Sequence, residues 1–366
     1  MPTVFFAFRD APERRAALHV AGALDRYRLF GLDEVRVRGA GVRHNLERQR
    51  GSPLWARAAA TVVNRVLRLA GGYGGDFASV FASLATANRA DVVFATNDTV
   101  GLPLILLKRA GLLRPPLVYA AIGLPERLAQ LRNQQMRRVY ASAFRRAKAI
   151  IAYAQSEAKA LRDSLGSDAP VVFLPFGVDV DAFSPGAALG EDVDVVSVGA
   201  DPHRDFGLLL AVAARHPELS FVIVAAADHA RGLGRTPDNV AVEVDVPLER
   251  VRERLAGARL VALPVRRNSY SGATTVLLQA MAMAKPVVVS QTDAIASGYG
   301  LVNGFNCRLV PPGDVDAFER ALLETLAGAD GLGAQARATV VKEFTWEQYT
   351  GRLWQILSAA WAREAS

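Results

Sequence analysis

The sequence predicts an α/β protein built from two doubly wound parallel sheets. Short β-rich apolar runs alternate with amphipathic helical stretches along the chain, as in βαβ units whose helices cover both faces of a sheet. The alternation restarts near Asp192, after a loop rich in Pro and Gly between residues 170 and 186. The length of 366 residues fits two domains. We therefore expect an N-terminal domain over residues 1–178 and a C-terminal domain over residues 179–366, and leave open whether the last helix returns to the first.

Each half contains apolar runs with strand character and amphipathic stretches with helical character. The strands predicted in the first half are Thr3–Phe8, Val92–Thr96, Leu117–Ala121 and Ala149–Tyr153. The strands predicted in the second half are Val193–Gly199, Phe221–Ala226, Val240–Val244, Leu260–Pro264 and Pro286–Ser290. The predicted helices are Asp76–Asn88, Arg132–Lys148, Phe206–His216, Pro247–Ala256, Thr274–Ala284, Val315–Ala327 and Trp346–Ala362. Because ligands of such sheets bind outside the carboxyl ends of the strands, we expect the chemistry in the loops after strands, in a cleft between two facing Rossmann-like domains.

Composition excludes several classes of protein. Hydrophobic residues make up 51% and charged residues 22% of the chain, which excludes disorder over most of its length. The single cysteine, Cys307, excludes a disulfide scaffold and a zinc site made of cysteines. The N-terminus lacks the basic segment of a signal peptide, and the most apolar segment, Val100 to Leu107, is far shorter than a membrane span. We expect a soluble cytoplasmic protein.

Charge is distributed unevenly between the two halves. Met1 to Val178 contains 26 Lys and Arg against 13 Asp and Glu, whereas Asp179 to Ser366 contains 17 against 23. This asymmetry predicts different partners for the two domains. No nucleic-acid-binding motif accompanies the basic half, so we expect its partner to be an anionic substrate or a membrane surface rather than nucleic acid. A general preference of the genome for arginine is the alternative explanation.

The loop that follows the strand ending at Pro264 is the most informative one. Its small residues Gly272 and Ala273 lead into a helix that begins near Thr274 and Thr275. Free backbone N–H groups, the helix dipole and two hydroxyls together make such a turn suitable for an anion. The alternative is an ordinary helix start with Thr274 as the N-cap residue.

Five segments resemble one protein family. Residues 278–288, LQAMAMAKPVV, resemble the LEAMAxGxPVV signature of retaining GT-B glycosyltransferases of the GT4 group. Four more segments follow in the family's order. The end of its N-terminal domain resembles residues 150–158, and its PNGVDxxxFxP linker resembles residues 174–185. Its first C-terminal strand with the phosphate loop resembles residues 197–206, and its GxNGxLVPPGD segment resembles residues 302–314. The resemblance is specific from about Ala149 onward and implies the GT-B fold, two Rossmann-like domains across a cleft.

The resemblance also implies roles for residues of the donor site. Gly199 begins the phosphate loop, and Arg204 matches the Lys of the family's Arg/Lys diphosphate clamp. Ala200 stands where the clamp has its Arg, and Arg266 with its neighbour Arg267 is placed to compensate. For each arginine the alternative is a solvated surface side chain. A guanidinium and the N–H groups of residues 272–275 would stabilise a departing diphosphate without a metal.

Two family glutamates are replaced in this chain. The residue toward the donor sugar is Ser271, and the one toward the ribose hydroxyls is Gln279. Both side chains can still form hydrogen bonds, but the amide lacks the strength of a charged acceptor. We count Arg204 and Ser271 as the catalytic candidates and Gln279 as a nucleotide-binding candidate.

On the acceptor side, Asp98 and Gly123 follow two apolar runs at strand ends. Asp98 either orients an acceptor or caps the helix that follows it. The Gly-rich run Gly71–Asp76 predicts a flexible loop near this site. No histidine spacing and no Asp-x-Asp motif in a sugar-donor loop indicates a metal, so we expect neither a metal nor another cofactor.

Residues 53–70 predict a basic amphipathic helix. Arg57, Arg65 and Arg68 fall on one arc, with Trp55 and several Ala, Val and Leu residues opposite. Such a helix either contacts a membrane surface, which would place the protein at the inner face of the membrane, or packs on the N-terminal sheet.

Together these observations predict a retaining, metal-independent glycosyltransferase that uses a nucleoside diphosphate sugar. The acceptor is a sugar, a lipid-linked compound or another small molecule. The alternatives are a GT-B epimerase or sugar-phosphate synthase, and a binding protein without catalysis, suggested by Ser271 and Gln279.

Overall fold

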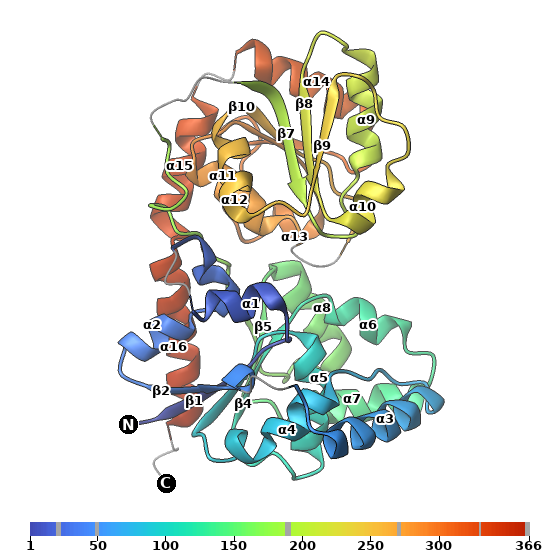
Figure 1. Ribbon diagram of the computed structural model, residues 1–366, viewed down its shortest axis with the longest axis vertical. Helices are drawn as coiled ribbons and strands as arrows, with labels where there is room; N and C mark the ends of the chain where they lie inside the picture. The colour runs from blue at the N-terminus through green and yellow to red at the C-terminus, as the bar shows by residue number, and fades with distance from the viewer. Residues whose placement is uncertain (20–22, 48–50, 187–191, 269–271, 329–330, 363–366) are drawn as a thin grey trace. The chain divides into compact units, whose positions relative to one another are not determined.

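The computed structural model in Figure 1 describes residues 1–19, 23–47, 51–186, 192–268, 272–328 and 331–362. The chain forms two compact units, of which the first contains Met1–Leu174 with Thr350–Ser366 and the second Pro175–Tyr349. Each unit is built on a six-stranded parallel sheet with helices against it. The two-domain α/β fold that the sequence predicts is confirmed.

The sheet of the first unit contains the four predicted strands and two more. From edge to edge it runs β2 (Gly41–His44), β1 (Thr3–Ala7), β3 (Val92–Ala95), β4 (Leu117–Ala121), β5 (Ala149–Ala152) and β6 (Val171–Phe173). The two strands that the sequence did not predict, β2 and β6, are the edges. Both are short and only partly buried, so they lack the continuous apolar run that marks the central strands. Because β6 completes this sheet, the loop between the two sheets begins later than the sequence suggested.

Helices cover both faces of this sheet. They are α1 (Pro12–Ala17), α2 (Leu32–Val37), α3 (Leu54–Leu69), α4 (Phe77–Ala87), α5 (Asp98–Arg109), α6 (Leu124–Gln130), α7 (Gln134–Phe144) and α8 (Gln155–Leu165), with two short 3₁₀ turns at Ala23–Leu29 and Asn45–Glu47. Side chains of α4, α5, α7 and α8 form one core with the facing strand residues, in which Tyr119 meets Phe144 edge to face. Helix α3 packs mainly on α4, and its Leu67 lies against the core of this sheet.

The Gly-rich run before α4 is held by hydrogen bonds to its neighbours. Pro103 lies inside α5 and has no N–H to give to the Thr99 carbonyl, and the Asp76 N–H donates to that carbonyl instead, at 2.8 Å. A Cβ at Gly75 would lie 2.6 Å from the same carbonyl oxygen, so only glycine lets the chain approach so closely. The run is therefore packed against the proline of α5 by these contacts, while its flexibility and its place near the acceptor stay predictions.

The sheet of the second unit contains the five predicted strands and one more edge. In spatial order it runs β12 (Arg308–Val310), β11 (Val287–Ser290), β10 (Ala258–Leu263), β7 (Val193–Gly199), β8 (Phe221–Ala225) and β9 (Val240–Val244). The unpredicted strand, β12, has three residues of which one is buried. The direction of winding reverses between β7 and β10, which makes their carboxyl ends the switch point of this sheet.

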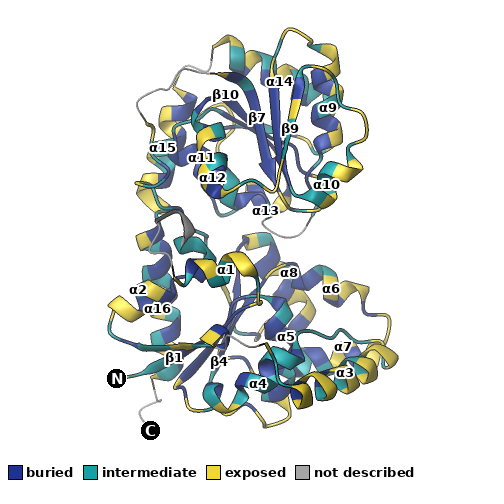
Figure 2. Cartoon of the chain, viewed as in Figure 1, coloured by how far each residue is buried: buried dark blue, intermediate teal, exposed yellow. Residues whose placement is uncertain are grey.

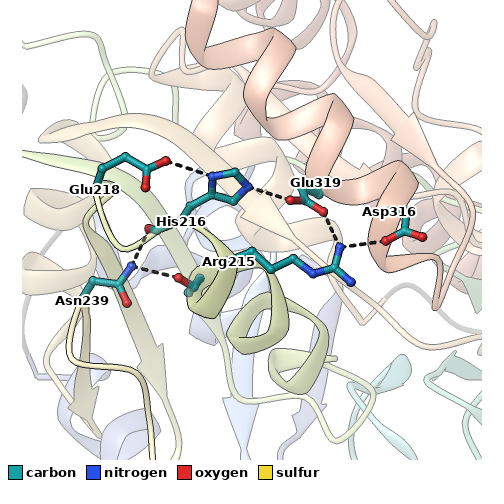
Figure 3. Close-up of polar contacts among 7 residues, drawn as sticks. Arg215, His216, Glu218, Asn239, Asp316 and Glu319 are labelled. Atoms are coloured by element: carbon teal, nitrogen blue, oxygen red, sulfur yellow. Dashed lines mark hydrogen bonds and ion pairs between the residues drawn. The ribbon is translucent and has the colours of Figure 1, made fainter.

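The helices after β7 are α9 (Phe206–Arg215), α10 (Ala227–Gly232), α11 (Leu248–Ala256), α12 (Thr274–Ala282), α13 (Asp293–Ala296), α14 (Val315–Ala327), α15 (Leu332–Glu343) and α16 (Trp346–Trp361), of which α16 belongs mostly to the first unit. Helices α9 and α14 share one core with the sheet. Figure 3 shows how their ends are joined, with Arg215 between Asp316 and Glu319, and His216 between Glu218 and Glu319. Hydrogen bonds to Glu319 and Glu218 raise the pKa of His216. The network lies away from the strand ends that carry the predicted donor residues.

The last helix, α16, begins in the second unit and continues in the first from Thr350. Within the first unit it lies against the start of α2. A Cβ at Gly31 would be 3.2 Å from both Leu353 and Thr350, and Gly31 has a φ of 85°. Glycine is therefore required there for both space and backbone conformation.

Candidate functional site

Two loops meet at the switch point of the second sheet. The loop after β7 and the loop after β10 are joined by backbone hydrogen bonds, from Asp205 N–H to the Pro264 carbonyl at 2.9 Å and from Arg266 N–H to the His203 carbonyl at 2.8 Å. Arg204 and Val265 also form an isolated antiparallel bridge. The fold thus holds the predicted donor residues of both loops side by side.

Arg204 is the buried cation of this site. Its side chain is only 3% exposed, so the alternative of a solvated surface arginine is wrong for this residue. The guanidinium occupies the space beside Gly199, where a Cβ would overlap it. Gly199 therefore makes room for Arg204. A guanidinium screened from water attracts an anion more strongly than an exposed one.

Helix α12 begins beside this arginine loop without a side-chain cap. Its N-cap residue is Ala273, and Thr274 is the first helical residue, so the alternative that Thr274 caps the helix is wrong. The Thr274 hydroxyl is buried and has no hydrogen-bond partner among the described residues. Thr275 is half-buried. The first N–H groups of a helix need partners from outside it, and an anion can supply them.

Gly272 brings the start of α12 next to an acid that the sequence analysis missed. A Cβ at Gly272 would lie 2.6 Å from the Asp201 carboxylate. Asp201 accepts a hydrogen bond from the His203 N–H at 2.8 Å and lies 3.5 Å from the His203 ring. A single Asp in a loop gives no signal in the sequence, because its neighbours come from folding.

The other donor candidates occupy different environments. Arg266 is exposed, and its guanidinium reaches Asp205 only at 3.5 Å, so it lies at the rim. Gln279 is buried in α12. Ser271, the second catalytic candidate, lies outside the described residues.

The carboxyl ends of the first sheet carry a buried acid cluster. Asn97, not Asp98, caps α5 by accepting from the Thr99 N–H, so the capping alternative for Asp98 is wrong. Asp98 is buried, accepts from the Tyr119 hydroxyl at 2.7 Å, and lies 3.4 Å from Arg127. Burial raises the pKa of Asp98 to about 6, although the Tyr119 hydrogen bond and Arg127 oppose the rise.

Glu157 completes this cluster and was missed by the sequence analysis. It lies in the first turn of α8, is fully buried, and accepts from the Gly123 N–H at 2.8 Å. Gly123 has a φ of 74°, which favours glycine. Burial raises the pKa of Glu157 to about 8. The Gly123 hydrogen bond lowers this pKa, and the nearby charge of Asp98 raises it further. The carboxyl holds the turn where Gly123 was predicted to meet the acceptor.

A cavity of about 450 Å³ lies elsewhere in the first unit, beside β2 and α1. Its lining combines charged residues and histidines, among them Arg15, His19, Arg36 and His44, with three leucines. The volume falls within the range of small-molecule sites. The sequence analysis did not predict it, because its walls come from segments without a common motif.

Within the described ranges, no three His, Cys, Asp or Glu side chains lie together as a metal site would require. None of the helices in the described part of the chain is long and apolar enough to cross a bilayer.

Comparison with known proteins identifies the family. Residues 32–182 match the family model of Glycosyltransferase Family 4, and residues 198–328 match that of Glycosyl transferases group 1. Together the matches cover more than half of the chain. The chain belongs to the family 4 glycosyltransferases. No curated protein matches the sequence.

Solved structures show that the glycosyltransferase shares its fold with distant proteins. Sucrose-phosphate synthase from Thermosynechococcus elongatus is 18% identical, with a TM-score of 0.72 over 98% of this chain and 100% of that one. HepE from Anabaena, in complex with UDP-glucose, is 16% identical, with a TM-score of 0.71 over 98% and 99%. The catalytic domain of starch synthase IV from Arabidopsis thaliana, bound to ADP and acarbose, is 11% identical, with a TM-score of 0.66 over 99% of both chains. The predicted GT-B fold is confirmed.

Proposed function

We propose that this glycosyltransferase moves a sugar from a nucleoside diphosphate sugar to an acceptor hydroxyl, with retention of configuration and without a resident metal ion. The observation that carries the proposal is the buried Arg204, seated against Gly199 beside the uncapped start of α12. A buried guanidinium and a helix start without a side-chain cap together suit a doubly anionic group. HepE was solved in complex with UDP-glucose and starch synthase IV with ADP, which supports a nucleotide as the ligand proposed for this chain.

In the proposed reaction, the bond between the sugar C1 and the diphosphate oxygen breaks, and a bond between C1 and the acceptor oxygen forms. Negative charge grows on the diphosphate as the sugar leaves, and the acceptor's proton leaves with that diphosphate. Arg204 and the N–H groups of Gly272 to Thr275 would stabilise this charge, as preorganised donors do at other developing anions. Gln279 would bond the ribose hydroxyls, and Arg266 would screen the phosphates at the rim.

Retention requires no strong general base on the acceptor side, and the first unit fits this requirement. Glu157 accepts from the Gly123 N–H and so positions that turn, while Asp98 accepts from the Tyr119 hydroxyl. In the proposal they orient an acceptor hydroxyl and do not remove its proton. A lipid-linked acceptor would also explain a membrane contact through residues 53–70, which belongs to the same proposal.

Thermal unfolding with a panel of UDP, GDP, ADP and dTDP sugars tests the donor, since a ligand that binds only the folded state raises the melting temperature. We expect one base to give the largest shift, and the shift to persist in EDTA. With that donor and candidate acceptors, release of nucleoside diphosphate measures transfer, and the NMR coupling of the new anomeric proton gives its configuration. Binding without release under every acceptor would favour a non-catalytic binding protein, and an inverted product would exclude retention.

A further inference from the structure

Helix α3 presents three different faces along its 16 residues. One face packs on α4 through the buried side chains of Ala56 and Ala60, with Leu67 against the core beneath. Small alanines bring the helix close to α4 but leave its larger side chains outside the contact. Figure 2 shows α3 as largely exposed along its length.

The second face is an exposed apolar stripe, which we define as Trp55, Val62, Val66 and Leu69. These side chains are between 57% and 80% exposed. Their spacings of seven, four and three residues put them on one side of a helix. Single exposed apolar residues are ordinary on a protein surface, but four in a row on one helix indicate a binding surface.

The third face carries Arg57, Arg65 and Arg68, all exposed. None of the three forms an ion pair with another described residue. The sequence from residue 48 to residue 75 contains five arginines and no Asp or Glu. The positive charge of this segment is therefore not neutralised within it, and it adjoins the apolar stripe along the whole helix.

We infer that α3 docks the enzyme on an anionic phospholipid bilayer, with the apolar stripe in the interface and the arginines at the lipid phosphates. The inference rests on the membrane contact in the proposed function. It adds the charge of the lipid and the two faces of α3 that would contact the bilayer. An apolar face with a Trp beside a row of arginines is the composition of helices that lie in a bilayer interface. The long arginine side chains can reach the head groups while their stems cover apolar surface.

The charge of α3 argues against a second copy of the chain as the occupant. A twofold contact through this helix would bring each row of arginines close to its own symmetry mate, and like charges repel. The helix is also small for a dimer interface. Its 16 residues span about 24 Å, and the one exposed face of a helix of that length offers less area than the roughly 800 Å² that a stable interface buries on each partner. An anionic bilayer meets both requirements of the surface, because it offers acyl chains and negative charge together.

Co-sedimentation of the full chain with vesicles tests the inference, using phosphatidylcholine with 30% phosphatidylglycerol against phosphatidylcholine alone. We expect binding to the anionic vesicles at 0.1 M salt and its loss at 1 M, where charges are screened. Changing Arg57, Arg65 and Arg68 to Gln together should weaken binding about a hundredfold, from about fivefold for each arginine. Changing Val62, Val66 and Leu69 to Ser should weaken it at least as much.

Matched controls separate the surface from net charge and general hydrophobicity. The exposed Arg235, Arg252 and Arg320 of the second unit, changed to Gln, remove the same charge and should leave binding within a factor of two. The exposed Leu112, Val244 and Val341, changed to Ser, serve as the apolar control. Three outcomes would each overturn the inference. They are an equal loss of vesicle binding in the controls, no vesicle binding by the parent, and dimerisation of the parent that the Ser variants abolish. Because no transfer reaction is involved, failure here leaves the proposed activity standing.

Discussion

The two sheets of this enzyme have similar winding but opposite chemistry at their carboxyl ends. In the second unit, the ends of β7 and β10 hold the buried Arg204 and the start of α12. In the first unit, the ends of β3 to β5 hold two buried carboxyls, Asp98 and Glu157. The sheet determines where a site can form, and the loops determine what it can bind.

The comparison also separates the net charge of a unit from the charge of its site. Residues 1–178 are strongly basic and residues 179–366 acidic, yet the buried ionisable groups at the strand ends are carboxyls in the first unit and an arginine in the second. Surface charges act in solvent, where they are screened, while a buried group acts at short range with little screening. We therefore expect the buried groups, rather than the surface charge, to decide the effects of substitution at each site.

Replacement of Arg204 by Ala should have the largest effect on turnover. Loss of one preorganised donor to a developing anion costs about 2–4 kcal/mol, or roughly a thirty- to thousandfold loss of kcat. Steady-state release of nucleoside diphosphate measures it. The exposed Arg252→Ala variant is the control and should retain full activity. Arg204→Lys keeps the charge without the planar fork, and circular dichroism checks that both variants fold. Activity of Arg204→Ala within a factor of three of the parent would remove this residue from the site.

Replacement of Gly199 by Ala should impair turnover by displacing Arg204. The added methyl would overlap the guanidinium, and such overpacking costs about 1–3 kcal/mol. In an Arg204→Ala background the same methyl has room, so the second loss should vanish, and the pair should be strongly non-additive. Gly207→Ala in α9 is the matched control, because its Cβ would meet its nearest neighbour at an ordinary 3.7 Å. Additive losses would show that Gly199 does not act through Arg204.

Replacement of Glu157 by Gln should change the pH dependence of stability. The folded protein binds this proton more tightly than the unfolded chain, with a pKa of about 8 against 4.5. Stability of the parent should therefore fall as pH rises from about 4.5 to 8, by up to about 1.4 kcal/mol per pH unit.

The Gln variant mimics the protonated form and can still accept from the Gly123 N–H. We expect it to match the parent near pH 5 and to exceed it in urea unfolding at pH 8.5. The contribution of His216 is common to both proteins and cancels in the difference. A parent and variant with parallel pH curves would contradict the raised pKa.

Replacement of Gln279 by Leu should give the smallest effect. If its amide bonds the ribose, binding of a ribonucleotide should weaken by about 0.5–1.5 kcal/mol, the range for a neutral hydrogen bond. Binding of the 2′,3′-dideoxy form should hardly change, and the comparison cancels general effects on folding. Gln279→Glu should tighten ribonucleotide binding, because a charged acceptor bonds more strongly. Calorimetric titration measures all of these, and equal losses for both nucleotides would show that Gln279 does not read the ribose.

The sequence alone determined the class of the fold and most of its central elements. Largely apolar runs mark strands buried on both faces, so β7 is recovered to the residue. Val315–Ala327 is recovered as well, and the structure shows that Asp314 caps its start. The edge strands β2, β6 and β12 were not predicted from the sequence, because a short and half-exposed strand has no such apolar run. The segment signatures were also sufficient to indicate the family.

Only the tertiary structure decided which charged residues are buried and what they meet. Arg204 and Arg266 are both single arginines in loops, yet packing against Gly199 buries one and leaves the other at the rim. Glu157 is an acid in the first turn of a helix, and its pKa rises because folding buries it, although Gly123, 34 residues away, donates to it. The spacing of apolar residues along the sequence indicates which side of a helix or strand is apolar. Burial and pKa depend on contacts between residues distant in the chain, which exist only after folding.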